Sequence, residues 1–523
     1  MLRSLCLKPF PQLNARTFFA LLGLTLIFRC WLAAATPITG DEAYFIWWGW
    51  RPDWGFYDHP PMVGWWLAAL LKISDSEAWL RLPVILQPGV LALGVIAALR
   101  HLAPALDEVQ RYSIGMLVLL APANVWNIFI TTDTPLVYFC VFSGLAWCRA
   151  VQDDDMRWYL AAGVLLAGAV LSKYFAALLG FAYLVDVVCR RKLRAWVGLA
   201  VVYAACLPAL ALMAWWNAGH CWPNYMFNFV NRHTHKASLS FKTPLLYVVS
   251  LLYLLTPPAL WLAWRRLANA DFLRKDELSP SAKPGSALGR LAWTPLALFA
   301  LLSLTKQIGL HWLLAFIPFV LVWGALRLNA ETLRRLCLFF IGFAALHVAA
   351  ILLVSRLPLE TWKKTQIYDG LVLTFEHDAL LKQLAPYEKD WVWAMDGYSN
   401  AVTLGYNARR YFLVFGEASS HARHDDILTD FRPLNGRNIL VLRKTAPDLA
   451  DYQPYFARVT VDSFDVRGAR FWRVKGEQFN YAAYHGQVLT TIKRKYYAIP
   501  EWLPQTGCYF CERYFPEEKP SRL

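Results

Sequence analysis

The chain has 523 residues, of which 57% are hydrophobic and only 17% charged, and its formal net charge is +15. One soluble core cannot bury that much apolar surface, so the composition excludes a soluble single-core protein and predicts a polytopic α-helical membrane protein. The 52 lysines and arginines are scattered among loops rather than gathered on one face, which argues against nucleic-acid binding.

Apolar runs that suit a membrane follow one another from the N-terminus to about residue 355. A hydrocarbon core about 30 Å thick needs about 20 apolar residues in each helix. The first run is not followed by a small-residue cleavage site, so we expect a retained helix rather than a signal peptide. In total we expect about eleven transmembrane helices, near residues 17–35, 83–100, 112–130, 134–150, 158–172, 174–189, 195–216, 244–264, 291–304, 308–326 and 336–355.

Basic residues indicate how these helices are oriented. If the N-terminus lies inside, the inner connections between helices collect more arginines and lysines than the outer ones, among them residues 190–192, as the positive-inside rule requires. Counting helices from that start places the segment after the first helix, Asp133 and the turn at Lys173 on the outer face. The same count brings the loop 217–242 and Lys306 there, so one external site can draw on all of them.

The first outer loop, residues 36–82, carries ionisable groups beside aromatic rings. Asp41 and Glu42 follow the first helix, and Asp58 and His59 precede two prolines that forbid a continuing helix. Charged groups at a membrane surface are costly unless they perform a task. The first two acids could instead cap a helix, and turn chemistry alone could explain Asp58. It does not explain His59, whose imidazole can contact an anion or bind a metal.

Further candidates are expected on the same face. Asp133 precedes Thr-Pro and could act as an acid of the site or cap the next helix. Lys173 and Lys306 each lie at an outer turn, where a lysine either contacts a phosphate or extends to the membrane surface. Arg232 and His233 add positive charge in a loop, where solvated charge is the commoner explanation.

After residue 356 the composition changes from apolar runs to short segments typical of strands. Polar stretches of helix or turn character separate them. We therefore expect a transmembrane domain over residues 1–356 and, on the outer side, an α/β domain with an aromatic, charged tail over residues 357–523. The expected strands include residues 391–395, 411–415, 438–442 and 471–474.

The cysteines leave one question open. Many of the ten cysteines lie in apolar runs, as small core residues do. Cys508 and Cys511 form a CxxC pair in the outer tail, which fits a local disulfide, free thiols or part of a metal site. No second ligand pair accompanies them in the sequence, so the metal site is the least favoured of the three.

Carboxylates and cations that meet at the outer membrane face fit glycosyl transfer from a lipid-phosphate sugar. A carboxylate deprotonates the acceptor hydroxyl as it attacks the anomeric carbon, and cations stabilise the departing phosphate. Phosphate is a good leaving group, so no general acid is needed. The alternative is a transporter or flippase of lipid-linked sugars, which often shows inverted repeats and ionisable groups at the membrane midplane; the sequence shows no such repeat.

Four short motifs resemble a known family. Residues 41–42, 57–62, 132–136 and 172–174 read DE, YDHPPM, TDTPL and SKY. In this order they are similar to bacterial glycosyltransferases of the GT-C fold, in the group related to protein O-mannosyltransferases and lipid A aminoarabinose transferases. The resemblance covers about residues 15–355.

The resemblance implies a division of roles. Asp41 matches the acid of the first loop that serves as catalytic base, Glu42 supports it, and Asp133 is a second acid that orients acceptor or donor. His59 stands where aminoarabinose transferases have a lysine, a departure that bears on the donor sugar and on phosphate contact. Some members use a divalent metal and others do not; Glu42, Asp58 and His59 are the candidate ligands here.

Together these expectations describe an inverting glycosyltransferase of the bacterial inner membrane. Its periplasmic site is expected to move a sugar from undecaprenyl phosphate to lipid A, lipopolysaccharide or another envelope glycolipid, with a protein acceptor less favoured. The residues expected to contact substrate or phosphate are Asp58, His59, Lys173, Arg232, His233 and Lys306.

Overall fold

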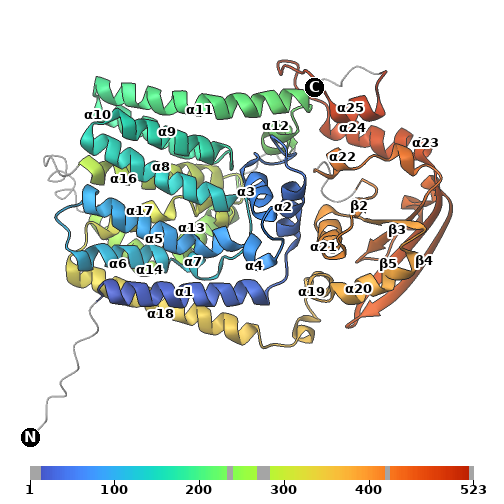
Figure 1. Ribbon diagram of the computed structural model, residues 1–523, viewed down its shortest axis with the longest axis horizontal. Helices are drawn as coiled ribbons and strands as arrows, with labels where there is room; N and C mark the ends of the chain where they lie inside the picture. Colours follow the sequence, from blue (N-terminus) through green and yellow to red (C-terminus); the bar gives the residue numbers. More distant parts are fainter. Residues whose placement is uncertain (1–12, 232–238, 268–282, 418–423, 518–523) are drawn as a thin grey trace, which may run out of the picture.

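The computed structural model describes residues 13–231, 239–267, 283–417 and 424–517. Long helices form a bundle at one end of the molecule, and a sheet-containing domain lies at the other (Figure 1). The bundle contains α1 (Ala15–Ala35), α5 (Leu82–Leu102), α6 (Glu108–Leu119), α7 (Pro122–Trp126), α8 (Asp133–Asp153), α9 (Met156–Val170), α10 (Ala176–Arg190), α11 (Leu193–Gly219), α13 (Lys242–Leu255), α14 (Pro257–Leu267), α16 (Lys283–Ser303), α17 (Ile317–Ala325) and α18 (Ala330–Val354).

Each predicted apolar run contains helix in the structure. Six helices in the described ranges are long and apolar enough to cross a membrane by length and composition, beginning with α1 and ending with α18, and shorter apolar helices accompany them. The helical membrane domain predicted from composition is therefore present.

Three runs expected as single helices are interrupted, among them the run at 308–326, where the 3₁₀ helix Leu310–Leu313 and a turn precede α17. The run at 112–130 divides into α6 and α7, after which residues 127–131 are extended and lead into α8. The run at 244–264 breaks between α13 and α14 at Thr256, whose φ is +65°. Pro257 follows directly, and a proline disfavours helical geometry at the residue before it.

The first outer loop folds into three short helices, α2 (Gly40–Trp50), α3 (Met62–Leu71) and α4 (Glu77–Leu80). They lie between the bundle and the C-terminal domain, together with α12 (Pro223–Tyr225) (Figure 1). Helix α2 is almost wholly buried, because it packs on α3 on one side and on the C-terminal domain on the other. The loop that carries the candidate residues is thus held from both sides.

The C-terminal domain contains a five-stranded mixed sheet in the order β2-β1-β3-β5-β4. Its strands are β1 (Trp391–Met395), β2 (Leu413–Val414), β3 (Asn438–Arg443), β4 (Phe456–Val466) and β5 (Ala469–Phe479). Strands β1, β2 and β3 are parallel, whereas β5 pairs antiparallel with both β3 and β4. The four expected strand segments are present, but β4 was missed and β5 is longer than predicted.

Helices cover both faces of this sheet. Alternate residues of β3 point to opposite sides, as strand geometry requires: Leu440 and Leu442 join one core cluster, and Ile439 and Val441 join another. The first cluster includes α19 (Tyr368–Phe375), α20 (His377–Leu384) and α21 (Tyr398–Ala408); the second includes α23 (Tyr481–Tyr484), α24 (Thr490–Tyr496) and α25 (Tyr509–Tyr514).

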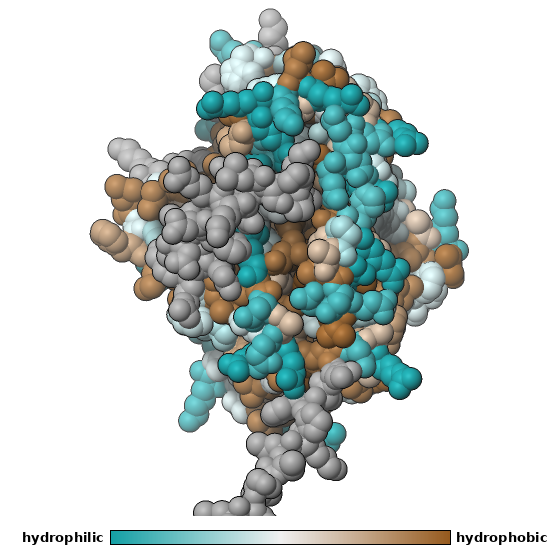
Figure 2. All heavy atoms as spheres, turned by 90° about the vertical axis from the view of Figure 1, so that its left-hand side faces the viewer, coloured by the Kyte–Doolittle hydropathy of each residue, from teal (hydrophilic) through white to brown (hydrophobic). Residues whose placement is uncertain are grey.

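The opposite end of the molecule is hydrophilic. Figure 2 faces the end of the bundle farthest from the C-terminal domain, and hydrophilic side chains gather there. The connection between α10 and α11 lies at this end in Figure 1 and exposes Arg191, Lys192 and Arg194. These are among the basic residues that the positive-inside rule assigns to the inner face.

Candidate active site

A buried ion pair fixes the start of the outer loop. Arg81, directly before α5, donates from Nε to Oε1 of Glu42 at 2.8 Å and from Nη2 to Oε2 at 2.7 Å, and both side chains are fully buried. A bidentate pair of this kind is strong and geometrically specific. The same guanidinium also donates to three backbone carbonyls at or just beyond the end of α1, those of Ala33, Thr36 and Pro37. The pair therefore joins the end of α1 to the starts of α2 and α5.

The carboxylate of Glu42 is saturated by protein donors. Besides the two bonds from Arg81, it accepts from the N–H and the hydroxyl of Thr39, in a capping box at the start of α2, and from the N–H of Ile130. Five donors fill the roughly four lone-pair positions that a carboxylate offers. Glu42 thus holds the first turn of α2 in place beside Asp41, and it has no position left for a metal or a substrate.

Asp41 is the exposed acid of this turn. Its Oδ1 accepts a hydrogen bond at 3.3 Å from the hydroxyl of Tyr398, the first residue of α21. The neighbouring Gly40 lies so close to Ser399 that a Cβ at this position would collide with that side chain. The start of α2 therefore meets the start of α21, and the Asp41 carboxylate is open to solvent beside that junction.

The loop of Asp58 and His59 is held by polar side chains from other elements. Asp58 is buried and accepts at 3.2 Å from the hydroxyl of Tyr44 on α2. Asn228 donates to the carbonyl of Asp58, and Asn224 donates to the carbonyl of Phe56. His59 is partly exposed. The loop backbone is thus fixed, whereas the imidazole can be reached from solvent.

His424, from the C-terminal domain, also contacts this loop. Its backbone N–H donates to the Tyr44 hydroxyl at 2.9 Å, and its ring packs edge-on against Trp48 and Phe56. Burial lowers the pKa of His424 to about 4, although Asp58 and Asp53 oppose that shift. Nδ1 of this ring has no hydrogen-bond partner among the described residues. The imidazole is therefore neutral at pH 7 and contacts the outer loop through Trp48 and Phe56, whereas the backbone of His424 contacts it through Tyr44.

Asp133 and Lys173 form a second buried pair. Lys173 Nζ lies 2.8 Å from both carboxylate oxygens of Asp133, at the first turn of α8. The N–H of Met62, which begins α3, donates to the carbonyl of Leu171 at 3.0 Å, so the exit of the His59 loop joins the segment that carries Lys173. The structure thus brings an expected acid and an expected cation into direct contact.

Lys306 lies at the same end of the bundle. The Phe175 ring, two residues from Lys173, contacts Phe299 and Trp312, which bracket Lys306 in the sequence. Lys306 itself is partly buried. The two remaining expected cations, Arg232 and His233, lie outside the described residues.

The three candidate metal ligands of the outer loop do not come together as a metal site. Glu42 is saturated, and Glu42, Asp58 and His59 do not converge within the described ranges. Across those ranges, only one group of three or more potential ligands comes together, and it lies elsewhere, at Cys221, Cys508 and Cys511. No step of the chemistry is therefore assigned to a metal at the outer loop.

Several residues of this region escaped prediction because their partners are distant in sequence. Arg81 is a lone arginine before an apolar run, which gave no sign that it would bind Glu42. Tyr44, Tyr398 and His424 look like ordinary aromatic residues in the sequence. Only the folded contact between α2 and the C-terminal domain reveals their position.

Comparison with known proteins confirms the expected resemblance. A family model described as dolichyl-phosphate-mannose-protein mannosyltransferase matches residues 58–216. This segment includes Asp58, His59, Asp133 and Lys173, whereas Asp41 and Glu42 precede it. The chain is thus similar to this family from the loop before α3 to α11, which is less than half of its length.

A curated relative matches part of the chain. Lipid A galacturonosyltransferase RgtD of Rhizobium johnstonii is 29% identical over 195 residues, which are 36% of this chain and 40% of that protein. The match therefore spans less than half of the relative's length.

Solved structures show the same fold over most of the chain. ArnT from Cupriavidus metallidurans, solved in the apo state and bound to undecaprenyl phosphate, has a TM-score of 0.57 at 16% identity, covering 88% of this chain and 98% of ArnT. At this identity the likeness establishes the fold. The chain is a multi-pass membrane protein with an ArnT-like arrangement of helices and a C-terminal mixed-sheet domain.

Proposed function

We propose that the protein transfers a sugar from a polyprenyl-phosphate donor to a lipid of the cell envelope, with inversion at the anomeric carbon. The family match supports glycosyl transfer. The ArnT structure with undecaprenyl phosphate supports the donor class, and the name of RgtD supports lipid A as acceptor.

One contrast among the four acids predicted as site candidates carries the proposal. Glu42, Asp58 and Asp133 are buried and hydrogen-bonded by protein groups, whereas Asp41 is exposed. A general base must reach the hydroxyl from which it takes the proton. Asp41 is therefore the acid of this group that an acceptor can approach.

In the proposed reaction, Asp41 accepts the proton of the acceptor hydroxyl as that oxygen attacks the anomeric carbon. The bond between that carbon and the phosphate oxygen breaks, and the phosphate leaves with the bonding electrons. Lys173 and His59, whose segments are joined by the hydrogen bond from Met62 to Leu171, would stabilise the phosphate. Contact with the phosphate would then draw Lys173 partly away from Asp133, which frees that carboxylate to orient a substrate hydroxyl.

The wider architecture follows from the same proposal. Residues 1–356 would form the transmembrane domain with about eleven membrane-crossing helices. Residues 357–523 would form a periplasmic domain that covers the outer loop. The protein would then reside in the bacterial inner membrane with its site facing the periplasm, where lipid A is accessible before export.

The test uses membranes that contain the full-length protein. Radiolabelled undecaprenyl-phosphate sugars, among them galacturonic acid and aminoarabinose, are incubated with lipid A, and the lipid products are separated. We expect label in lipid A only when the protein is present. Movement of the labelled donor across the membrane, with no label in any acceptor, would identify a flippase and overturn the proposal.

A further inference from the structure

Three cysteines from two distant segments meet beneath the C-terminal tail. Cys221 follows α11, whereas Cys508 and Cys511 belong to the tail and to α25. All three are buried, and their sulfur atoms lie within 4.8 Å of one another. The third sulfur, which the sequence spacing did not reveal, makes the CxxC pair part of a larger group.

The spacing of the sulfurs suits a single bound ion. A tetrahedral zinc site with Zn–S bonds of about 2.3 Å places its sulfurs about 3.8 Å apart. Here Cys508 Sγ and Cys511 Sγ are 2.8 Å apart, and no pair in the group exceeds 4.8 Å. Small side-chain rotations that change these sulfur–sulfur distances by about 1 Å would bring the shortest distance up and the longest distance down to the value in a zinc site.

The surroundings also suit thiolates. Gln505 Nε2 donates to Cys221 Sγ at 3.6 Å, and such donors stabilise metal-bound sulfur. Glu512, an exposed acid one residue after Cys511, accepts at Oε1 from the N–H of Cys508 at 2.8 Å. This bond holds the backbone of Cys508 at the start of α25.

We propose that Cys221, Cys508 and Cys511 bind one structural zinc ion. Thiolate sulfur is the ligand type that selects zinc among the common divalent cations. A disulfide would join only two of these three sulfurs. An ion uses all three, and each thiol gives up its proton when it binds the ion.

The ion would fasten the tail to the segment that supports the outer loop. The backbone already pairs there: the N–H of Cys221 donates to the carbonyl of Gly507, and the N–H groups of Thr506 and Gly507 donate to the carbonyl of Ala218. Three residues after Cys221, Asn224 holds the carbonyl of Phe56. The site would thus stabilise the base of the candidate active site without touching substrate.

The first measurement uses the full-length protein, purified in detergent without a metal-affinity tag. Elemental analysis should find about one zinc per chain, and alkylation should label these three cysteines only after a chelator removes the ion. A disulfide between any two of them in non-reduced peptide maps, or three freely alkylated thiols with no zinc, would overturn the proposal.

Variants locate the ion. Cys221→Ser and Cys508→Ser should each lose most of the zinc and lower the melting temperature. Cys337→Ser is the matched control, because Cys337 is also buried but lies on α18 and bonds to the carbonyl of Ser113. Wild-type zinc content in Cys221→Ser would contradict the assignment. The zinc and thiol measurements on the unaltered protein need no variant, so the proposal can be tested even if either serine variant folds poorly. Neither measurement depends on the transferase reaction.

Discussion

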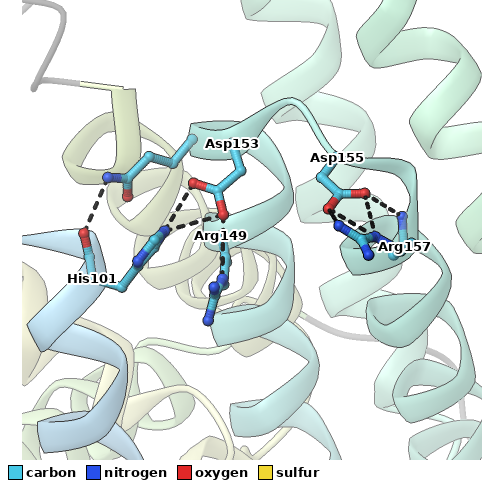
Figure 3. A network of polar contacts seen from close by, with 6 residues as sticks. His101, Arg149, Asp153, Asp155 and Arg157 are labelled. Carbon is cyan, nitrogen blue, oxygen red and sulfur yellow. Dashed lines mark hydrogen bonds and ion pairs between the residues drawn. The ribbon is translucent and has the colours of Figure 1, made fainter.

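Two sets of ion pairs, one at the bundle end expected to face inside and one at the end expected to face outside, differ in their exposure to solvent. At the inner end, Asp153 accepts from His101 and Arg149, and Asp155 accepts from Arg157, within the network drawn in Figure 3. These side chains are accessible, and that of Arg157 is 91% exposed. At the outer end, both members of the pair between Arg81 and Glu42 are 0% exposed, and the pair between Lys173 and Asp133 is nearly so.

This difference in exposure indicates which charged side chains the folded structure depends on. Exposed pairs contribute about 0 to 1 kcal/mol, because water already solvates both partners and salt screens them. A buried pair contributes little net stability compared with apolar residues, but breaking it by removing one partner costs about 3 to 5 kcal/mol. The outer end therefore depends on its charges for its shape, whereas the inner network can be altered with little effect.

The largest effect on stability is expected at the saturated pair. Glu42→Gln removes the charge opposite Arg81 and leaves a buried guanidinium unpaired, so the free energy of unfolding should fall by about 3 to 5 kcal/mol. Thermal unfolding of the purified protein measures this. The double variant Glu42→Gln/Arg81→Met should recover part of the loss, and no recovery would show that the pair is not the cause.

A buried, ion-paired acid away from the candidate active site provides a control for Glu42→Gln. Asp186 is buried and accepts from Arg190, Arg290 and Trp147 among the bundle helices. Asp186→Asn should also destabilise the protein, but the folded fraction should transfer sugar normally. If Glu42→Gln behaved in the same way, with normal transfer per folded molecule, Glu42 would have no part in positioning Asp41.

The second pair should give a smaller loss of stability, because it is slightly exposed. Asp133→Asn leaves Lys173 without its partner and should cost about 3 kcal/mol, near the lower end of the range for buried pairs. The same change should reduce transfer, because the proposal gives Asp133 a substrate hydroxyl to orient. Chemical denaturation and the transfer assay separate the two effects, and unchanged transfer by the folded variant would remove Asp133 from the site.

His424 gives the outer end a dependence on acid. Its folded pKa of about 4 lies below the ordinary value of 6.5, so its contribution to stability is complete above pH 6.5 and is lost as the pH falls toward 4. At pH 5 the loss is about 2 kcal/mol. His424→Gln removes this titration.

The measurement for His424 is the melting temperature between pH 7 and pH 4.5. The wild type should lose more stability over this interval than His424→Gln, while Asp53, Asp58, Arg51 and His220, the charged and titratable groups facing the ring, act in both proteins. Parallel curves would show that His424 is not buried as a neutral imidazole in the folded protein.

The smallest effect is expected at the inner network. Asp155→Asn breaks an exposed pair within the sequence Asp155-Met156-Arg157 and should leave the free energy of unfolding almost unchanged, with any difference vanishing in high salt. Thermal unfolding at low and high salt checks this. A loss comparable to that of Glu42→Gln would contradict the contrast between the two ends.

The sequence predicted the helices well, and it predicted that candidate residues would gather at one end of the bundle. It predicted less well which side chains those residues contact. Hydrophobic length found the helices because membrane insertion depends on it directly. It could not find Arg81 as the partner of Glu42, His424 beside the Asp58 loop, or Cys221 beside Cys508, since each of these contacts joins segments that are distant in sequence. Strand β4 was missed because its side chains alternate without a strongly apolar face, and most of them remain at least partly exposed.

We propose Asp41 as the base of a glycosyl transfer, held in position by the buried pair between Glu42 and Arg81. The direct test compares initial rates of sugar transfer to lipid A by wild type, Asp41→Asn and the control Asp155→Asn, each normalised to folded protein. Asp41→Asn should retain a wild-type melting temperature and lose at least about 100-fold in rate, while Asp155→Asn should match the wild type. Transfer by Asp41→Asn at the wild-type rate would contradict the account.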